Sequence, residues 1–127
     1  MKYTEFKSKV QNRANDIFTE NGVFWAFSNK RFMENRTPLA EGEKYVSLGG
    51  GGYIPSSKLK KFNDDFNELE AWENELFKQV DAEEAILYEL DNHEYCITYS
   101  ITDTLGALEQ FGITAEQIRA VANANYQ

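Results

Sequence analysis

His93, Glu94 and Cys96 lie within four positions of one another and supply an imidazole, a carboxylate and a thiol. These groups are found in zinc sites and in nucleophilic centres. The chain contains only one histidine and one cysteine, so it lacks the four ligands of a structural zinc site. A nucleophilic Cys–His pair would need a third group to orient it and is usually assembled from distant segments, whereas these two residues are close in sequence. We therefore predict no metal, no cofactor and no enzymatic activity. We expect His93 to lie at a helix end, hydrogen-bonded to backbone.

The glycine run Gly49–Gly52 has two interpretations. Four glycines accept positive φ at low cost, which favours a hairpin turn or a bulge that leads into Tyr53–Ile54. Glycine also lets backbone amides approach an anion, so the run could bind phosphate. It lacks the Lys-Ser/Thr ending of a P-loop and the spacing of a dinucleotide fingerprint, and the turn is the simpler interpretation.

Charge is distributed unevenly along the chain. Residues 1–62 contain eleven Lys and Arg against six Asp and Glu, whereas residues 63–94 contain one Lys and twelve Asp and Glu. The acidic segment is either the solvated face of amphipathic helices or a surface that complements a basic partner, which would speed association. The residues predicted to form such a partner-binding face are Asp64, Asp65, Glu68, Glu73, Glu75, Glu83 and Glu84.

Basic side chains surround the aromatic segments and provide an alternative site. Lysine and arginine next to exposed aromatic residues can bind single-stranded nucleic acid. The residues predicted for this alternative are Lys58, Lys60, Lys61 and Arg31. The net charge of −8 and a pI near 4.7 oppose nonspecific binding to nucleic acid or to an anionic membrane. Direct nucleic-acid binding is therefore the second choice.

The elements that position these side chains are mostly helical by periodicity. Strands are expected where aromatic and β-branched residues cluster, at Val23–Phe27, Lys44–Leu48 and Tyr53–Ile54. The first of these is nearly continuous in apolar residues, which predicts a central strand covered on both faces. Residues Ile97–Ile101 form either a fourth strand or an extended connection. The expected helices are Thr4–Glu20, a short turn through Phe32–Met33, Lys58–Val80, a helix begun by an Asp81–Glu84 capping box, one from Thr102 to Phe111, and one begun by a Thr114–Gln117 capping box.

These elements predict an α+β fold, with a small antiparallel sheet of three to four strands packed against about five helices. The length of 127 residues predicts a single compact domain. Trp25, Phe62, Phe66 and Trp72 are expected in the core beneath the acidic face. A lone cysteine and the absence of a signal peptide or an 18-residue apolar segment predict a soluble, cytoplasmic protein.

Three stretches together resemble a family of small, acidic, functionally uncharacterised proteins found in phages and mobile elements. These stretches are Phe24-Trp25-Ala26-Phe27-Ser28-Asn29, Glu41-Gly42-Glu43-Lys44-Tyr45-Val46-Ser47 and Tyr88-Glu89-Leu90-Asp91-Asn92-His93-Glu94. The ending Gly112-Ile113-Thr114-x-x-Gln117 fits the same pattern. The resemblance implies the context of anti-CRISPR and anti-restriction proteins, which bind and block a nuclease of host defence. It implies no catalytic residues.

We therefore predict a non-enzymatic inhibitor or interaction protein located in the cytoplasm of the host cell. Its partner is expected to be the basic surface of a nuclease, of a ribonucleoprotein or of a CRISPR effector. The contact face would be the acidic helices of residues 63–94.

Overall fold

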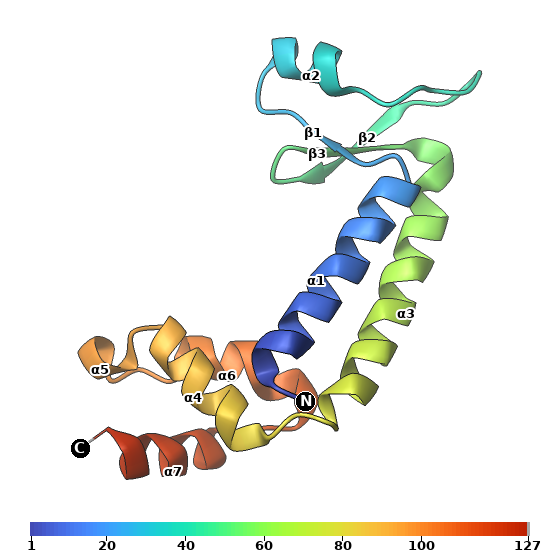
Figure 1. Ribbon diagram of the computed structural model, residues 1–127. Helices are drawn as coiled ribbons and strands as arrows, with labels where there is room; N and C mark the ends of the chain where they lie inside the picture. Colours follow the sequence, from blue (N-terminus) through green and yellow to red (C-terminus); the bar gives the residue numbers. More distant parts are fainter. Residues whose placement is uncertain (127) are drawn as a thin grey trace. The chain divides into compact units, whose positions relative to one another are not determined.

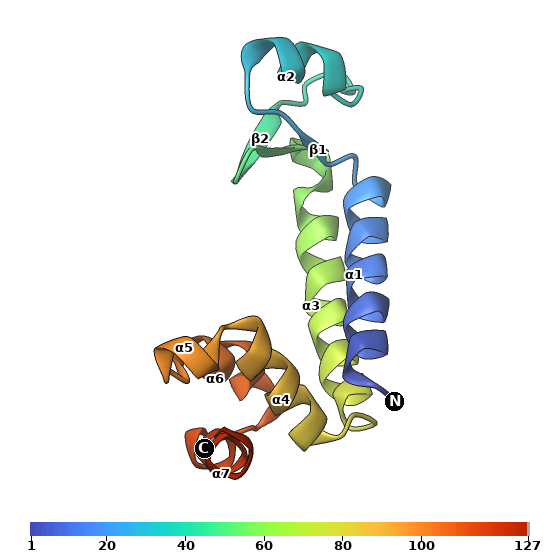
Figure 2. The ribbon, with the colours of Figure 1, turned by 60° about the vertical axis from the view of Figure 1, so that its left-hand side comes forward.

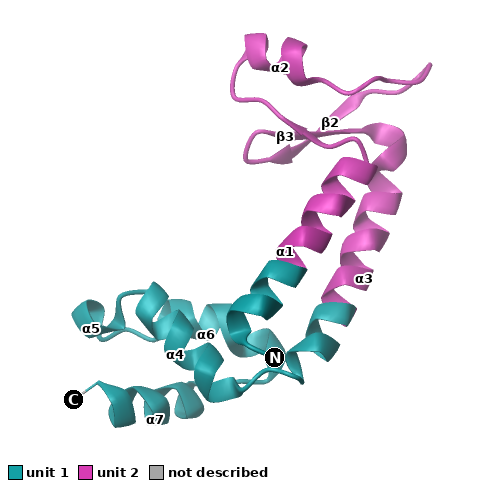
Figure 3. Ribbon diagram, viewed as in Figure 1, with its two compact units in different colours: residues 1–9, 72–127 teal, residues 10–71 magenta. Residues whose placement is uncertain are grey.

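The computed structural model describes residues 1–126. The chain divides into two compact units (Figure 3). The sheet unit comprises residues 10–71, and the helical unit comprises residues 1–9 together with the chain from Trp72 onward. Helices α1 (Tyr3–Glu20) and α3 (Leu59–Phe77) each begin in one unit and end in the other. The single domain expected from chain length stays a prediction.

The sheet unit is built on three antiparallel strands in the order β1-β3-β2. These strands are β1 (Phe24–Trp25), β2 (Tyr45–Gly49) and β3 (Gly52–Pro55). The mixed α+β class is confirmed, with three strands among the described residues. The central position of Val23–Phe27 was predicted wrongly, because β3 lies in the middle and β1 at an edge. Only Phe24 and Ala26 of that segment are buried, while Trp25 and Phe27 are exposed.

Helix α2 (Asn29–Asn35) lies on one side of this sheet and the end of α1 with the start of α3 on the other (Figures 1 and 2), and an aromatic cluster forms on each side. On one face, Phe32 of α2 packs on Tyr53, Tyr45 and Phe24, with ring centroids 5.0–5.3 Å apart. On the other face, Phe18 at the end of α1 packs against Trp25, Phe62 and Phe66, the last two from α3, at 5.4–5.9 Å. Aromatic pairs at these distances stabilise a fold beyond the area that they bury.

The helical unit contains α4 (Ala82–Asn92), α5 (Tyr95–Thr98), α6 (Thr102–Leu108), the 3-10 turn η2 (Glu109–Phe111) and α7 (Ala115–Asn125). Its core is aliphatic and fully buried, formed by Ile86, Leu90, Leu108 and Ile118. A second cluster stacks Phe77 on Phe111 at 4.1 Å, with Phe6 edge-on to both. The alternative of a fourth strand at Ile97–Ile101 was wrong, because that segment holds the end of α5 and a loop.

Local sequence signals set the ends of most helices. Gly22 and Gly112 adopt positive φ just after α1 and η2, as expected for helix stops. The Thr114–Gln117 capping box is confirmed at the start of α7. At α4 only half of the expected box forms: Asp81 accepts a hydrogen bond from the Glu83 amide, whereas Glu84 accepts one from the Tyr3 amide. The short 3-10 turn η1 (Ser56–Lys58) precedes α3.

Candidate functional site

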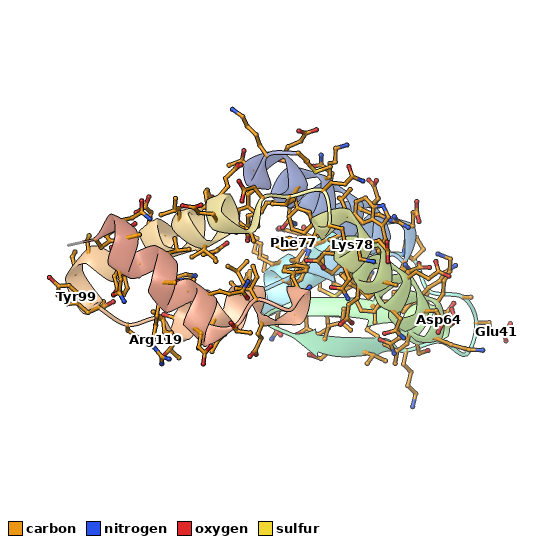
Figure 4. All side chains as sticks on the ribbon, turned by 90° about the horizontal axis from the view of Figure 1, so that it is seen from below. Glu41, Asp64, Phe77, Lys78, Tyr99 and Arg119 are labelled. Carbon is orange, nitrogen blue, oxygen red and sulfur yellow. The ribbon has the colours of Figure 1, made fainter. Side chains whose placement is uncertain are left out.

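The seven predicted acidic residues are divided between the two units. The sheet-unit part of α3 carries Asp64, Asp65 and Glu68. The helical unit carries the other four, which are Glu73, Glu75, Glu83 and Glu84. Asp64 and Glu68 are exposed on α3, as is Glu83 on α4. Figure 4 shows Asp64 at the surface of α3. The structure thus provides two acidic groups, one in each unit.

Several of these carboxylates are used inside the fold. Asp65 Oδ2 accepts hydrogen bonds from Lys61 Nζ at 2.8 Å and from Asn21 Nδ2 at 2.9 Å. The hydrogen bond from Lys61, followed by that from Asn21, lowers the pKa of Asp65. Glu84 Oε1 accepts from the Tyr3 amide at 2.9 Å, and Glu75 pairs with Lys78 at 2.8 Å. Asp65 and Glu84 therefore stabilise the fold, which leaves the exposed carboxylates to face a partner.

The four predicted basic residues do not gather at one place. Lys58 and Lys60 are exposed around the start of α3, next to Lys61, whose ion pair with Asp65 raises the pKa of its ammonium. Arg31 lies on α2, on the other side of the sheet (Figure 1). The structure therefore separates Arg31 from the three lysines.

An exposed apolar tip occurs in the helical unit, at residues Glu94–Tyr99, which we name the α5 tip. Ile97 and Tyr99 are 71% and 73% exposed. Glu94 and Tyr99, on either side of the four-residue helix, have left-handed φ values of 56° and 54°. Residues other than glycine pay about 1–2 kcal/mol for that conformation. Tyr99 projects outward beside α5 (Figure 4), and sequence reasoning missed the tip because its apolar residues suggested a strand.

A second exposed apolar surface, the aromatic platform, consists of Trp25 and Phe27 on the backbone of Gly51 and Gly52. Phe27 is 84% exposed and Trp25 45%, so the prediction of Trp25 as a core residue was wrong. A Cβ at Gly51 would lie 2.5 Å from the Phe27 ring, and one at Gly52 would lie 2.8 Å from the Trp25 ring. The glycine run does form the predicted turn and bulge, but it also lets two rings lie against the chain.

Two pockets open on this platform, one of about 510 Å³ and one of about 340 Å³. The larger is lined by Trp25, Ala26, Phe27, Ser28, Arg31 and Asn35. The smaller is lined by Ala26, Phe27, Ser28, Asn29, Phe32, Gly51 and Tyr53. Arg31 is the one charged residue among them. Asn35 Nδ2 donates to the Trp25 carbonyl at 2.9 Å, which holds α2 against the platform.

Glu89 forms a buried polar cluster in the helical unit that the sequence pattern did not reveal. Its side chain is 2% exposed, and its Oε1 accepts from Tyr3 Oη at 2.7 Å and from Lys7 Nζ at 2.9 Å. His93 Nε2 lies 3.2 Å from the other oxygen. Burial alone would raise the pKa of Glu89, but the hydrogen bonds from Tyr3 and Lys7 outweigh it and lower that pKa. Since Tyr3 is buried as well, the cluster fastens the start of α1 to α4.

His93 ends α4, where its amide donates to the Glu89 carbonyl at 3.0 Å, as expected. Among residues 1–126, no group of three or more His, Cys, Asp or Glu side chains is placed to hold a metal ion. Cys96 is exposed. None of the described helices combines the length and apolar character that crossing a membrane requires.

Comparison with known sequences places the chain in a family. The sequence model of that family matches residues 6–125. The chain belongs to a family of unknown function, DUF7659. No curated protein matches the chain, and no solved structure matches it either. The expected membership in an uncharacterised family is thus confirmed, while nothing in the match points to phages or to CRISPR.

Proposed function

We propose that this protein is a non-enzymatic interaction protein whose helical unit binds a partner protein with a basic surface. The observation that carries the proposal is the α5 tip. It exposes Ile97 and Tyr99 in a unit that contains twelve Asp and Glu against five Lys and Arg. Clustered large apolar side chains at a surface mark contact sites between proteins.

Apolar and charged side chains contribute differently to such a contact. Buried apolar and aromatic side chains supply most of the affinity, whereas surrounding charges raise the association rate and disfavour wrong partners. Glu83 and Glu94 are among the exposed carboxylates that supply the negative charge of the helical unit. The ring of Tyr95 packs edge-on to Tyr99 at 5.9 Å, which limits the motion of the exposed ring before binding.

The strained backbone at Glu94 and Tyr99 supports the same conclusion. Left-handed conformations outside glycine concentrate at functional positions, where surrounding structure holds them in place. Here the two left-handed residues flank a helix of only four residues, and Ile97 is exposed between them. The more specific expectation, a nuclease or CRISPR effector as the partner, stays a prediction.

The alternative, nucleic-acid binding at Lys58, Lys60, Lys61 and Arg31, has less support as a single patch. Lys61 forms an ion pair with Asp65, and Arg31 lies on the far side of the sheet from the lysines. Lys58 and Lys60 alone give two exposed cations without an exposed aromatic ring of their own.

The test is affinity purification of the tagged full chain from lysate of its own host, followed by mass spectrometry. The wild type should retain one stoichiometric protein. The variants Ile97→Ser with Tyr99→Ser, and Glu83→Lys with Glu94→Lys, should lose it. Glu41→Lys, an exposed charge reversal in the sheet unit, should retain it. Retention by every variant, or loss in Glu41→Lys, would contradict the proposal.

A further inference from the structure

The aromatic platform of the sheet unit has a geometry that the proposed function does not use. The Phe27 ring lies so close to Gly51 that a Cβ there would be 2.5 Å from it, and 84% of the residue is exposed to solvent. Trp25 lies in the same way against Gly52, and its edge contact with Phe18 at 5.5 Å holds it in place. The two rings share the lining of the 510 Å³ pocket.

We infer that this platform binds single-stranded nucleic acid, with a base stacked on Phe27 and Trp25 and a backbone phosphate contacted by Arg31. Planar rings that are fixed on one side and open on the other bind bases of any sequence, because every base has a π face. The side chains of Ser28 and Asn35 in the same pocket add polar partners for a base edge or for a sugar.

Charge around the platform favours this ligand. Neither platform pocket has a carboxylate in its lining, and Arg31 supplies a guanidinium that matches phosphate geometry. Helix α2 and its C-cap residue carry Lys30, Arg31 and Arg36 against a single acid, Glu34. A peptide could also pack an aromatic side chain on the two rings, but it would not require basic residues beside them.

The net charge of −8 limits the mode of binding. A long polyanion is repelled by the whole protein, so affinity must come from a few stacked bases and few phosphate contacts. We therefore expect a weak dependence on salt, with a slope close to −1 in a double-logarithmic plot. Bases within a duplex are already stacked, so duplexes should not bind.

The experiment titrates the full chain with fluorescein-labelled single strands of twelve deoxythymidines and of twelve uridines, and with a duplex of equal length. Anisotropy reports binding. Quenching of tryptophan fluorescence by the oligonucleotide is measured for the wild type and for a Trp25→Phe variant. The difference between the two is the quenching of Trp25 itself. Binding of the DNA or of the RNA supports the inference, and the comparison of the two shows which is preferred.

Phe27→Ala should weaken binding by about five- to 150-fold, as loss of one stacked base predicts. Because Phe27 is exposed, thermal unfolding of this variant should match the wild type. Arg31→Ala should reduce the salt slope by about one. Met33→Ala, an exposed apolar residue on α2 outside both pockets, and Lys60→Ala are the matched controls and should bind as the wild type does.

Three results would overturn the inference: no single strand binds at low salt, Phe27→Ala binds as tightly as the wild type, or the duplex binds equally well. Binding of an acidic phenylalanine-containing peptide without any binding of oligonucleotides would assign the platform to a protein partner instead. The result is independent of the proposed function, since Ile97→Ser with Tyr99→Ser should leave oligonucleotide binding unchanged.

Discussion

The sheet unit and the helical unit expose large apolar side chains in different electrostatic surroundings. The sheet unit contains eight Lys and Arg against nine Asp and Glu, and its platform pockets are lined by Arg31 without a carboxylate. The helical unit contains five against twelve, and its α5 tip follows Glu94 directly. The comparison teaches that the chain's acidic net charge describes the surroundings of the α5 tip but not those of the platform. Two ligands of opposite charge can therefore be proposed for one acidic protein.

The units also differ in how they hold their exposed residues. Glycine at positive φ supports the platform at no steric cost, whereas the tip depends on Glu94 and Tyr99 in the same left-handed region. The helical unit is stabilised by a buried carboxylate, while the Lys61–Asp65 ion pair of the sheet unit lies at its surface. Each difference can be tested by one substitution.

The largest effect is expected from Glu89→Ala. The change leaves the buried Tyr3 Oη without its acceptor and removes the ion pair with the half-exposed Lys7, and an unsatisfied buried hydroxyl costs about 1–3 kcal/mol. Urea denaturation should show this decrease in the free energy of unfolding. Glu83→Ala, an exposed position on the same helix, should change it by less than about 0.5 kcal/mol. Equal effects of the two variants would contradict the role of Glu89.

A second comparison concerns two glycines of the turn. Gly50 and Gly51 both have positive φ, so alanine at either should destabilise the protein by about 1–2 kcal/mol. Only at Gly51 does the new Cβ meet the Phe27 ring, since Gly50 has open space around it. Gly51→Ala should therefore lose oligonucleotide binding as well, whereas Gly50→Ala should keep it. Identical binding by both variants would show that the ring position is unimportant.

Glu94→Gly should stabilise the helical unit. Relief of the left-handed strain exceeds the extra chain entropy of glycine, so we expect a gain of about 0.5–1 kcal/mol by thermal or urea denaturation. Asn92→Gly, at the last residue of α4, is the control and should destabilise by about 0.3 kcal/mol. A loss of stability in Glu94→Gly would mean that the glutamate side chain itself stabilises the tip.

The smallest effect is expected for the Asp65 ion pair. The folded pKa of Asp65 is lowered by Lys61 and Asn21, so its contribution is present above the unfolded pKa of about 4 and is lost as pH falls through the folded pKa. Asp65→Asn should therefore be less stable than the wild type at pH 7, and this difference should shrink on acidification below pH 4. Denaturation curves across that range provide the measurement. A constant difference would exclude the titration of Asp65 as its source.

Sequence reasoning was accurate where the determining interactions are local. The Thr114–Gln117 box begins a helix through contacts within a few residues, and it was predicted correctly. Sequence reasoning failed for Glu89, because its partner Tyr3 lies 86 positions away and a charged helical residue is ordinarily exposed.

The candidate surfaces show the same limit. The acidic residues were identified by type, but no local pattern indicated that Asn21, 44 positions away, would donate a hydrogen bond to Asp65. Of the predicted strand Val23–Phe27, only Phe24–Trp25 forms a strand, and the alternation of buried and exposed residues in this segment depends on which face the neighbouring elements cover. The α5 tip was missed because a short apolar run is ambiguous between strand and helix.

The Glu89 cluster also has a consequence for the order of events during synthesis. Residues 10–71 form a continuous sequence, so the sheet unit has all its residues once Ala71 has left the ribosome. The helical unit takes residues from both sides of that segment, and Tyr3 and Lys7 cannot reach their carboxylate until Glu89 has been made. Contacts so distant in sequence form slowly, and domains made first generally fold first. Tyr3 and Lys7 are made before the sheet unit, yet they are expected to be among the last residues to reach their final positions.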